Sequence, residues 1–258
     1  MSPTPRSNQP YSSTLYGLGV GPGDPELITI KALKVLQSAP VVAFPAGING
    51  NPGVAEKIIE PWLQPTQVRL PLAFPYVLDD QQLLAAWQKA AETVLPYLAK
   101  GDVAFACEGD VSFYGTFTYL AQALQQLNSD VNVQAIAGIS SPMAAAAATH
   151  IPLTCQSDKL AILPALYSFC DSEQADAAAN ELETALDWAD VVVLMKVGRV
   201  YPQVWKILNR RGLLARSLVI ENATRPDEKV WIGLQNHPNL QLSYFSLLIV
   251  QREERTVR

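Results

Sequence analysis

Near its N-terminus the chain contains the segment Leu15-Tyr-Gly-Leu-Gly-Val-Gly-Pro-Gly-Asp-Pro-Glu-Leu27. An apolar run leads into a glycine-rich loop and then into helix-forming residues, as at the start of many nucleotide-binding α/β proteins. The spacing departs from the dinucleotide fingerprint G-x-G-x-x-G, because the sixth position is Pro22 counted from Gly17 and Asp24 counted from Gly19. The Gly-Lys-Ser/Thr run of a Walker loop is also missing from the sequence.

The residues after the glycines also disfavour a phosphate ligand. Asp24 is a good helix N-cap, Pro25 suits the first helical position, and Glu26 adds a second negative charge. Two carboxylates at the positive end of a helix dipole would repel a phosphate group. We therefore expect close backbone approach to a ligand without phosphate, which weighs against a nicotinamide-dependent oxidoreductase.

Apolar runs alternate with amphipathic stretches along the whole chain, and this pattern predicts an α/β fold. We expect a disordered leader at residues 1–13, α/β domains at residues 14–137 and 138–251, and a polar tail at residues 252–258. The expected strands are Thr14–Val20, Val41–Phe44, Asp102–Cys107, Val131–Ile136, Leu160–Leu163, Val191–Leu194, Ser217–Glu221, Lys229–Leu234 and Gln241–Val250, the last three as antiparallel hairpins. The expected helices are Pro25–Ser38, Asp79–Lys100 with a disturbance at Pro96, Phe117–Leu127, Ser140–Thr149 and Glu173–Leu186.

Composition excludes several classes of protein. The 258 residues are 49% hydrophobic and 17% charged, with a net charge of −5, which argues against a general nucleic-acid surface. Apolar runs are too short to span a bilayer, and the polar N-terminus lacks the apolar core of a signal peptide. Cys107, Cys155 and Cys170 are expected to be buried free thiols, and no metal site is expected because the histidines and cysteines lack ligand spacing.

Five segments, in order, resemble the tetrapyrrole (corrin and porphyrin) methyltransferases, and the resemblance covers about residues 15–250. The segments are Gly19-Val-Gly-Pro-Gly-Asp24, Glu108-Gly-Asp-Val-Ser-Phe-Tyr-Gly115, Ala137-Gly-Ile-Ser-Ser-Pro-Met143 with Ile151-Pro-Leu-Thr154, Val193-Leu-Met-Lys-Val197, and Glu221-Asn-Ala-Thr-Arg-Pro226.

The resemblance implies two α/β domains with a ligand cleft between them and antiparallel strands in the C-terminal part. It implies methyl transfer from S-adenosylmethionine, leaving S-adenosylhomocysteine, in a homodimer. The polar N-terminus leads us to expect a cytoplasmic protein. Gly-Asp-Pro-Glu-Leu, Glu-Gly-Asp-x-Ser-Phe-Tyr and Tyr244-Phe-Ser-Leu247 are most similar to the branch that methylates C-20 of precorrin-2 or its cobalt complex in cobalamin biosynthesis. The alternatives are another precorrin carbon, another acceptor such as diphthamide precursor protein or ribosomal RNA, and a non-enzymatic tetrapyrrole carrier.

The resemblance also assigns roles to individual residues. No general base is assigned; Tyr114 and Glu108 are the candidates to test, with a structural role as the alternative for each. Helix capping is the alternative for Asp110, Ser140 and Ser141, and core packing is the alternative for Met195. The residues implied in cofactor binding are Pro22, Glu108, Gly109, Asp110, Phe113, Ser140, Ser141, Met195 and Ala223, and those implied in substrate binding are Gly21, Gly23 and Asp24.

The implied substrate does not suit the overall charge, because precorrin-2 carries eight carboxylates and the chain is acidic. Local groups of cations would have to bind these carboxylates. The alternative for each cation is a solvated surface charge, which is favoured for Lys31 and Lys34. The candidate cations are Lys31, Lys34, Arg69, Lys196, Arg199 and Arg225.

Overall fold

The computed structural model describes residues 13–47, 51–75, 77, 79–165 and 172–252. The expected leader, apart from Ser13, and the expected tail, apart from Arg252, lie outside these residues. The chain divides into two compact units, Met1–Ser140 and Ser141–Arg258, so the division falls slightly beyond the expected boundary near Ala137. Each unit contains a five-stranded sheet with helices packed against it, which confirms the α/β fold class.

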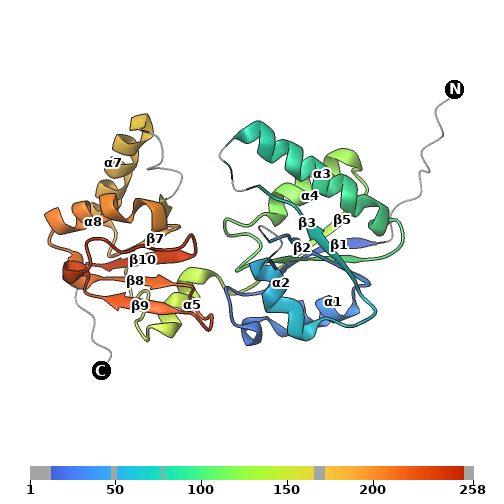
Figure 1. The fold of residues 1–258 in the computed structure, drawn as a ribbon, viewed down its shortest axis with the longest axis horizontal. Coiled ribbons are helices and arrows are strands. Elements are labelled where there is room, and N and C mark those ends of the chain that lie inside the picture. The colour runs from blue at the N-terminus through green and yellow to red at the C-terminus, as the bar shows by residue number, and fades with distance from the viewer. Residues whose placement is uncertain (1–12, 48–50, 76, 78, 166–171, 253–258) are drawn as a thin grey trace. The chain divides into compact units, whose positions relative to one another are not determined.

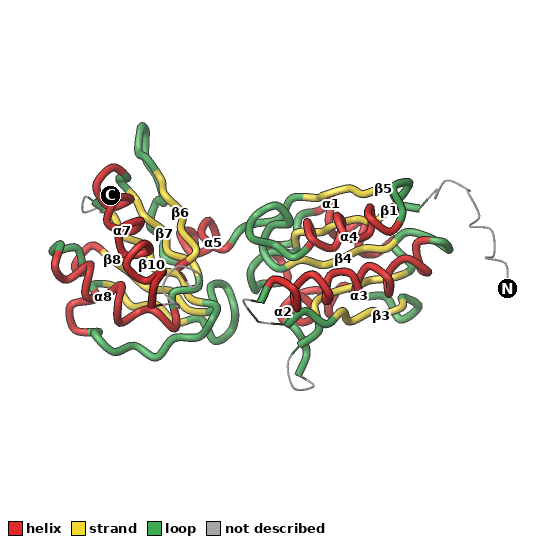
Figure 2. The backbone as a smooth tube through the Cα atoms, turned by 90° about the horizontal axis from the view of Figure 1, so that it is seen from above, coloured by secondary structure: helices red, strands yellow, loops and turns green. Residues whose placement is uncertain are grey.

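The sheet of unit 1 is entirely parallel, with the order β3-β2-β4-β1-β5. Figure 2 shows β5, β1 and β4 running side by side, with β3 at the far edge of the sheet. Parallel strands need helical crossovers, so helices cover both faces of this sheet. The strands are β1 (Thr14–Gly19), β2 (Val41–Pro45), β3 (Val68–Leu72), β4 (Val103–Cys107) and β5 (Asn132–Ile136).

Side chains alternate between two cores along the strands of unit 1. Val103 and Phe105 face one core, which α3 (Asp80–Leu98) and α4 (Phe117–Leu127) cover. Ala104 and Ala106 face the other core, which α1 (Ile30–Ser38) and α2 (Val54–Ile59) cover. This period of two explains why the strands of a doubly covered sheet are apolar throughout.

The expectation of one continuous helix from Pro25 to Ser38 is wrong. A short 3-10 turn covers Pro25–Leu27, and the Asp24 side chain caps it by accepting a hydrogen bond from the Glu26 N–H (2.8 Å). The backbone is extended at Ile28, and α1 begins at Ile30 with Thr29 as its N-cap. Helix α3 tolerates Pro96 inside its last turn and ends at Leu98, before the expected Lys100.

Unit 2 has a mixed sheet with the order β6-β7-β10-β8-β9. Strand β10 lies between β7 and β8 and is antiparallel to both, while β6 is parallel to β7 and β9 is antiparallel to β8. The expected hairpin of the last two strands is therefore wrong, although β8 and β9 do form one. The strands are β6 (Leu160–Pro164), β7 (Val191–Met195), β8 (Ser217–Glu221), β9 (Lys229–Ile232) and β10 (Ser246–Gln251).

The burial pattern explains the position of β10. All of its residues are buried, as a central strand requires, whereas β9 carries exposed Val230 and Ile232 at the sheet edge. Helices α7 (Ser172–Trp188) and α8 (Tyr201–Arg210) cover one face, and α5 (Ser141–Ala148) opens the unit. Among the α-helices and strands of the described residues, α2, β3 and α8 were not expected from the sequence.

We predict that Gly17→Ala destabilises unit 1. A Cβ atom at Gly17 would lie 2.5 Å from atoms of the Phe117 ring, so the ring or the strand must move, at a cost of about 1–3 kcal/mol in the free energy of unfolding. Urea unfolding measures this change. Gly101→Ala is the matched control, since its Cβ would meet nothing closer than the Pro40 ring carbon at 3.2 Å. Equal stability of the two variants would contradict the prediction.

Candidate functional site

In unit 1, the loops that follow β1, β4 and β5 leave the same edge of the sheet. These strands are adjacent and parallel, so their carboxyl ends coincide, and open α/β sheets bind ligands at this edge. Ten of the residues predicted to form the site lie on these loops. They are Gly21, Pro22, Gly23, Asp24, Glu108, Gly109, Asp110, Phe113, Tyr114 and Ser140.

A reciprocal pair of hydrogen bonds joins the first two loops. The Gly109 N–H donates to the Gly21 carbonyl (2.8 Å), and the Gly21 N–H donates to the Gly109 carbonyl (3.2 Å). Both residues have a left-handed backbone, with φ of +83° at Gly21 and +72° at Gly109, which glycine adopts without a steric penalty. The two glycines therefore fix the loops to each other.

The glycines also allow the loops after β1 and β5 to touch. A Cβ at Gly19 would lie 2.5 Å from the Gly138 nitrogen, and a Cβ at Gly138 would lie 2.3 Å from the Gly109 carbonyl oxygen. These distances are too short for any side chain. The sequence predicted that this backbone would closely approach a ligand. At Gly19, the structure shows that the backbone closely approaches other loops of the same chain.

The Asp110 carboxylate connects the second loop to the third. Its Oδ2 accepts from the Gly138 N–H (2.7 Å), and its Oδ1 accepts from the Ser112 N–H (2.8 Å) and the Ser112 hydroxyl. Partial burial opposes ionisation, but these hydrogen bonds outweigh it and hold the pKa of Asp110 below its usual 3.8. The capping alternative is wrong for Asp110, because α4 begins after Thr116 with no side-chain cap.

The other predicted residues of unit 1 differ in exposure. Pro22 is buried, whereas Glu108 and Phe113 are partly exposed. Tyr114 is 49% exposed, has a φ of +52°, and packs edge to face against Phe113 with ring centroids 4.9 Å apart. A bulky residue with positive φ indicates local strain, which makes Tyr114 the more unusual of the two catalytic candidates.

The cysteine beneath the second loop is not a nucleophile at neutral pH. Burial raises the pKa of the Cys107 thiol to about 11, and a Cβ at Gly115 would lie only 2.9 Å from its sulfur. The expectation of buried thiols is correct for Cys107 and wrong for Cys155, which is exposed. Cys170 lies outside the described residues.

In unit 2, the predicted residues lie at strand and helix ends. Met195 ends β7, and Ala223 follows β8 closely; both are buried. Ser141 is the first residue of α5. Lys196 and Arg225, which the sequence offers as candidate cations, stand beside Met195 and Ala223 at these strand ends. Sequence analysis assigned no role to Tyr244 and Phe245, although the family-like segment Tyr244-Phe-Ser-Leu247 is the signal that could have indicated them.

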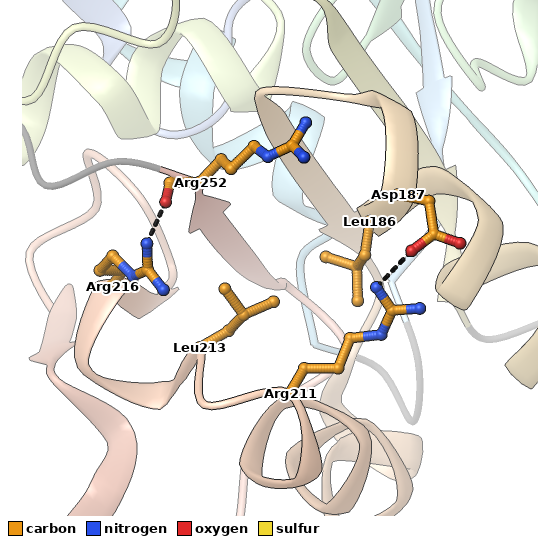
Figure 3. A pocket seen from close by; sticks show the side chains of 6 residues that line it. All are labelled: Leu186, Asp187, Arg211, Leu213, Arg216 and Arg252. Carbon is orange, nitrogen blue, oxygen red and sulfur yellow. Dashed lines mark hydrogen bonds and ion pairs between the residues drawn. The ribbon is translucent and has the colours of Figure 1, made fainter.

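An open pocket of about 520 Å³ lies at the other end of the unit 2 sheet, where α7 and α8 end (Figure 3). Arg211 donates to Asp187 (2.7 Å) and Glu183, and thereby joins α8 to α7, while Arg216 donates to the Arg252 carbonyl. The pocket contains none of the predicted site residues. It is lined by Leu186, Asp187, Arg211, Leu213, Arg216 and Arg252.

The described residues contain neither a helix suited to crossing a membrane nor a cluster of metal-ligating side chains. None of the helices there combines the length and apolar character needed to cross a membrane. Within the same residues, no three His, Cys, Asp or Glu side chains group in a way that could hold a metal ion.

Comparison with known proteins gives the family. The family of tetrapyrrole (corrin/porphyrin) methylases matches residues 14–236. The chain belongs to this family. A probable cobalt-precorrin-2 C(20)-methyltransferase of Methanocaldococcus jannaschii is 33% identical over 243 residues, 93% of this chain and 97% of that relative. A precorrin-2 C(20)-methyltransferase of Sinorhizobium sp is 33% identical over 247 residues, 92% of this chain and 94% of that relative.

The family fold is also recognised among solved structures. Uroporphyrin-III C-methyl transferase from Thermus thermophilus, in complex with S-adenyl homocysteine, has a TM-score of 0.64 at 21% identity. The similarity covers 93% of this chain and 98% of that one. At this identity the likeness concerns the fold alone.

We predict that the contribution of Asp110 to stability depends on pH. Its pKa is lowered on folding, so the contribution is fully present above the free value near 3.8 and is lost as the pH falls through the folded-state pKa. Asp110→Asn should therefore lower the melting temperature at pH 7 and lower it less at pH 3. Thermal unfolding of both proteins at the two pH values measures this, and a difference independent of pH would contradict it.

Proposed function

We propose that this tetrapyrrole methylase transfers a methyl group from S-adenosylmethionine to C-20 of precorrin-2 or cobalt-precorrin-2. The observation that carries the proposal is the 33% identity to two relatives named for methylation of this carbon, over more than nine-tenths of each chain. The cobalt-free and cobalt-containing substrates have equal support, because the two relatives are equally identical to this chain.

The loops of unit 1 suit this cofactor better than a nucleotide. S-adenosylmethionine carries a sulfonium cation, a ribose diol and an adenine but no phosphate. Asp24, Glu108 and Asp110 place carboxylates on the loops at the carboxyl edge, which favours a cation and hydroxyl groups over a phosphate. The bound cofactor would supply an electrophilic methyl group.

Catalysis would then depend mainly on position. Methyl transfer is an in-line displacement, in which the carbon–sulfur bond breaks as the new carbon–carbon bond forms. The linked loops around Gly21, Gly109 and Gly138 would keep the cofactor-binding surface rigid. Little conformational entropy would then be lost when the cofactor binds. Tyr114 and Glu108 stay the candidates for accepting the proton that C-20 releases.

The remaining cofactor contacts follow from the family resemblance. The residues that this resemblance implies are Pro22, Gly109, Phe113, Ser140, Ser141, Met195 and Ala223. Gly21, Gly23 and Asp24 would meet the substrate. The same resemblance supports a homodimer.

Methyl transfer itself is the first prediction from this proposal. Anaerobic incubation with S-adenosylmethionine and either precorrin-2 or cobalt-precorrin-2 should add one methyl group, detected by mass spectrometry and located at C-20 by NMR. The accepted substrate identifies the pathway. A methyl group at a different carbon, or none with either substrate, would refute the proposal, while calorimetry on the cofactor alone would show whether the protein still binds S-adenosylmethionine.

Cofactor affinity provides a second prediction. Asp110→Ala removes a carboxylate that the family resemblance assigns to cofactor binding and should weaken S-adenosylmethionine binding by at least tenfold, given about 1.5–3 kcal/mol for a charged hydrogen bond to the cofactor. Isothermal titration calorimetry measures the affinity. Ser112→Ala is the control, because it removes a hydroxyl donor and leaves the carboxylate bonded to Gly138. An unchanged affinity of Asp110→Ala, with folding verified by circular dichroism, would remove Asp110 from the site.

A further inference from the structure

Two cations in unit 2 are held against aromatic rings. The Lys196 Nζ lies 5.4 Å from the centroid of the Tyr244 ring, and the Arg225 guanidinium carbon lies 4.1 Å from the centroid of the Phe245 ring. The two rings are neighbours, with centroids 5.2 Å apart and planes at 88°. Lysine, tyrosine, phenylalanine and arginine side chains therefore form one continuous group, which we call the cation–aromatic group.

The strand order of the sheet brings these residues together from three parts of the sequence. Lys196 follows β7, Arg225 lies in the turn after β8, and the two aromatic residues directly precede β10, which runs between those strands. The Asn222 N–H donates to the Phe245 carbonyl (2.9 Å), which anchors the aromatic segment to the end of β8. Both cations thus stand at the sheet edge that holds Met195 and Ala223.

The backbone around both cations is strained. Lys196, Asn222 and Thr224 have φ values of +59°, +55° and +66°, although none is a glycine. Hydrogen bonds maintain the turn, since the Arg225 N–H donates to the Asn222 carbonyl (2.9 Å) and the Thr224 N–H donates to Glu228 Oε2 (2.6 Å). Strain of this kind persists where the surrounding structure enforces it, and it concentrates at functional sites.

The two cations differ from the other candidates for binding substrate carboxylates. Both are partly buried, while the remaining four are exposed on the surface. A charged group that packs against an aromatic ring is already restricted in position. It therefore loses less conformational entropy on binding an anion than a freely moving side chain does. The four exposed candidates are Lys31, Lys34, Arg69 and Arg199.

Three carboxylates near this turn accept hydrogen bonds from backbone or amide groups of the chain. Glu221 is buried, accepts from the Ser243 N–H (2.5 Å) and lies 3.8 Å from the Lys229 Nζ. Asp227 accepts from the Asn222 amide (2.9 Å), and Glu228 accepts from the Thr224 N–H as described above. These acids shape the turn that presents Arg225.

We propose that Lys196 and Arg225 bind carboxylate side chains of the tetrapyrrole substrate. The inference rests on the proposed function and identifies where an acidic protein of net charge −5 receives a polycarboxylate. The guanidinium presents a planar fork that matches a carboxylate in two parallel hydrogen bonds, and the ammonium presents a point charge. Tyr244 and Phe245 position the two cations.

The experiment compares Lys196→Met and Arg225→Met with the wild-type enzyme in the methyl-transfer assay. Each variant removes one charge and keeps an unbranched stem, so KM for the tetrapyrrole should rise about tenfold or more, as expected for a lost charged hydrogen bond. A contact that holds the substrate equally before and during methyl transfer affects KM and not kcat, so kcat should change little. The S-adenosylmethionine affinity, measured by calorimetry, should also stay within about twofold of wild type.

Two control variants separate a specific site from general charge. Lys206→Met removes one charge from an exposed position of α8 and should leave KM unchanged. Lys196→Arg keeps both a cation and its stacking partner and should retain most of the substrate affinity. An unchanged KM in both test variants would overturn the inference, as would an equal rise in Lys206→Met or a matching loss of S-adenosylmethionine affinity.

A binding measurement distinguishes failure of this inference from failure of the proposed function. Uroporphyrin, a stable porphyrin with eight carboxylates, is titrated into wild type and both variants and followed by its absorbance. If wild type methylates neither precorrin substrate, the proposed function fails. The carboxylate site is then supported by uroporphyrin binding that weakens at least tenfold in the variants, and it is overturned by undiminished binding or by no binding to wild type.

Discussion

The close approach of three loops at one sheet edge is the constraint on which unit 1 depends. The backbones of Gly19 and Gly138 approach each other and the Gly109 carbonyl at distances that exclude a Cβ atom on either of the first two glycines. The Asp110 carboxylate accepts a hydrogen bond from the Gly138 N–H, which would otherwise be unsatisfied, and so keeps the second loop in place. Since β4, β1 and β5 are neighbours, a change in the register of one strand would separate the loops. The glycines therefore couple the sheet to the candidate cofactor site.

In unit 2, the position of one strand brings distant segments together at one end of the sheet. Strand β10 enters the centre of the sheet antiparallel to its neighbours, so the segment that precedes it lies beside the ends of β7 and β8. An aromatic pair in that segment can then support a cation from each neighbouring strand end. In a sheet with β10 at the edge, Lys196 and Arg225 could not share one pair of adjoining rings.

The two units also differ in the charge that they present. The loops at the sheet edge of unit 1 carry carboxylates, which suit a sulfonium cation, whereas the sheet edge of unit 2 carries organised cations, which suit a polycarboxylate. An overall charge of −5 is therefore compatible with an acidic substrate, because binding depends on the local arrangement of charges. The arginines around the pocket of Figure 3 serve a different purpose, since Arg211 is paired with acids of α7 and connects two helices.

The sequence by itself determined the α/β class, the family and most strand positions, because buried strands and their flanking turns are local patterns of apolar and small residues. It also indicated that the glycine loop does not bind phosphate, since Pro22 and Asp24 interrupt the fingerprint. Local patterns failed where elements are short or half-exposed, as in α2 and β3, and where Ile28 breaks an apparent helix. Only the tertiary structure decided that Gly19 faces Gly138, that Asp110 binds Gly138, and that β10 places two rings beneath Lys196 and Arg225. These contacts join residues far apart in the chain, and the order of strands in a sheet, which sets them, follows from packing of the whole unit.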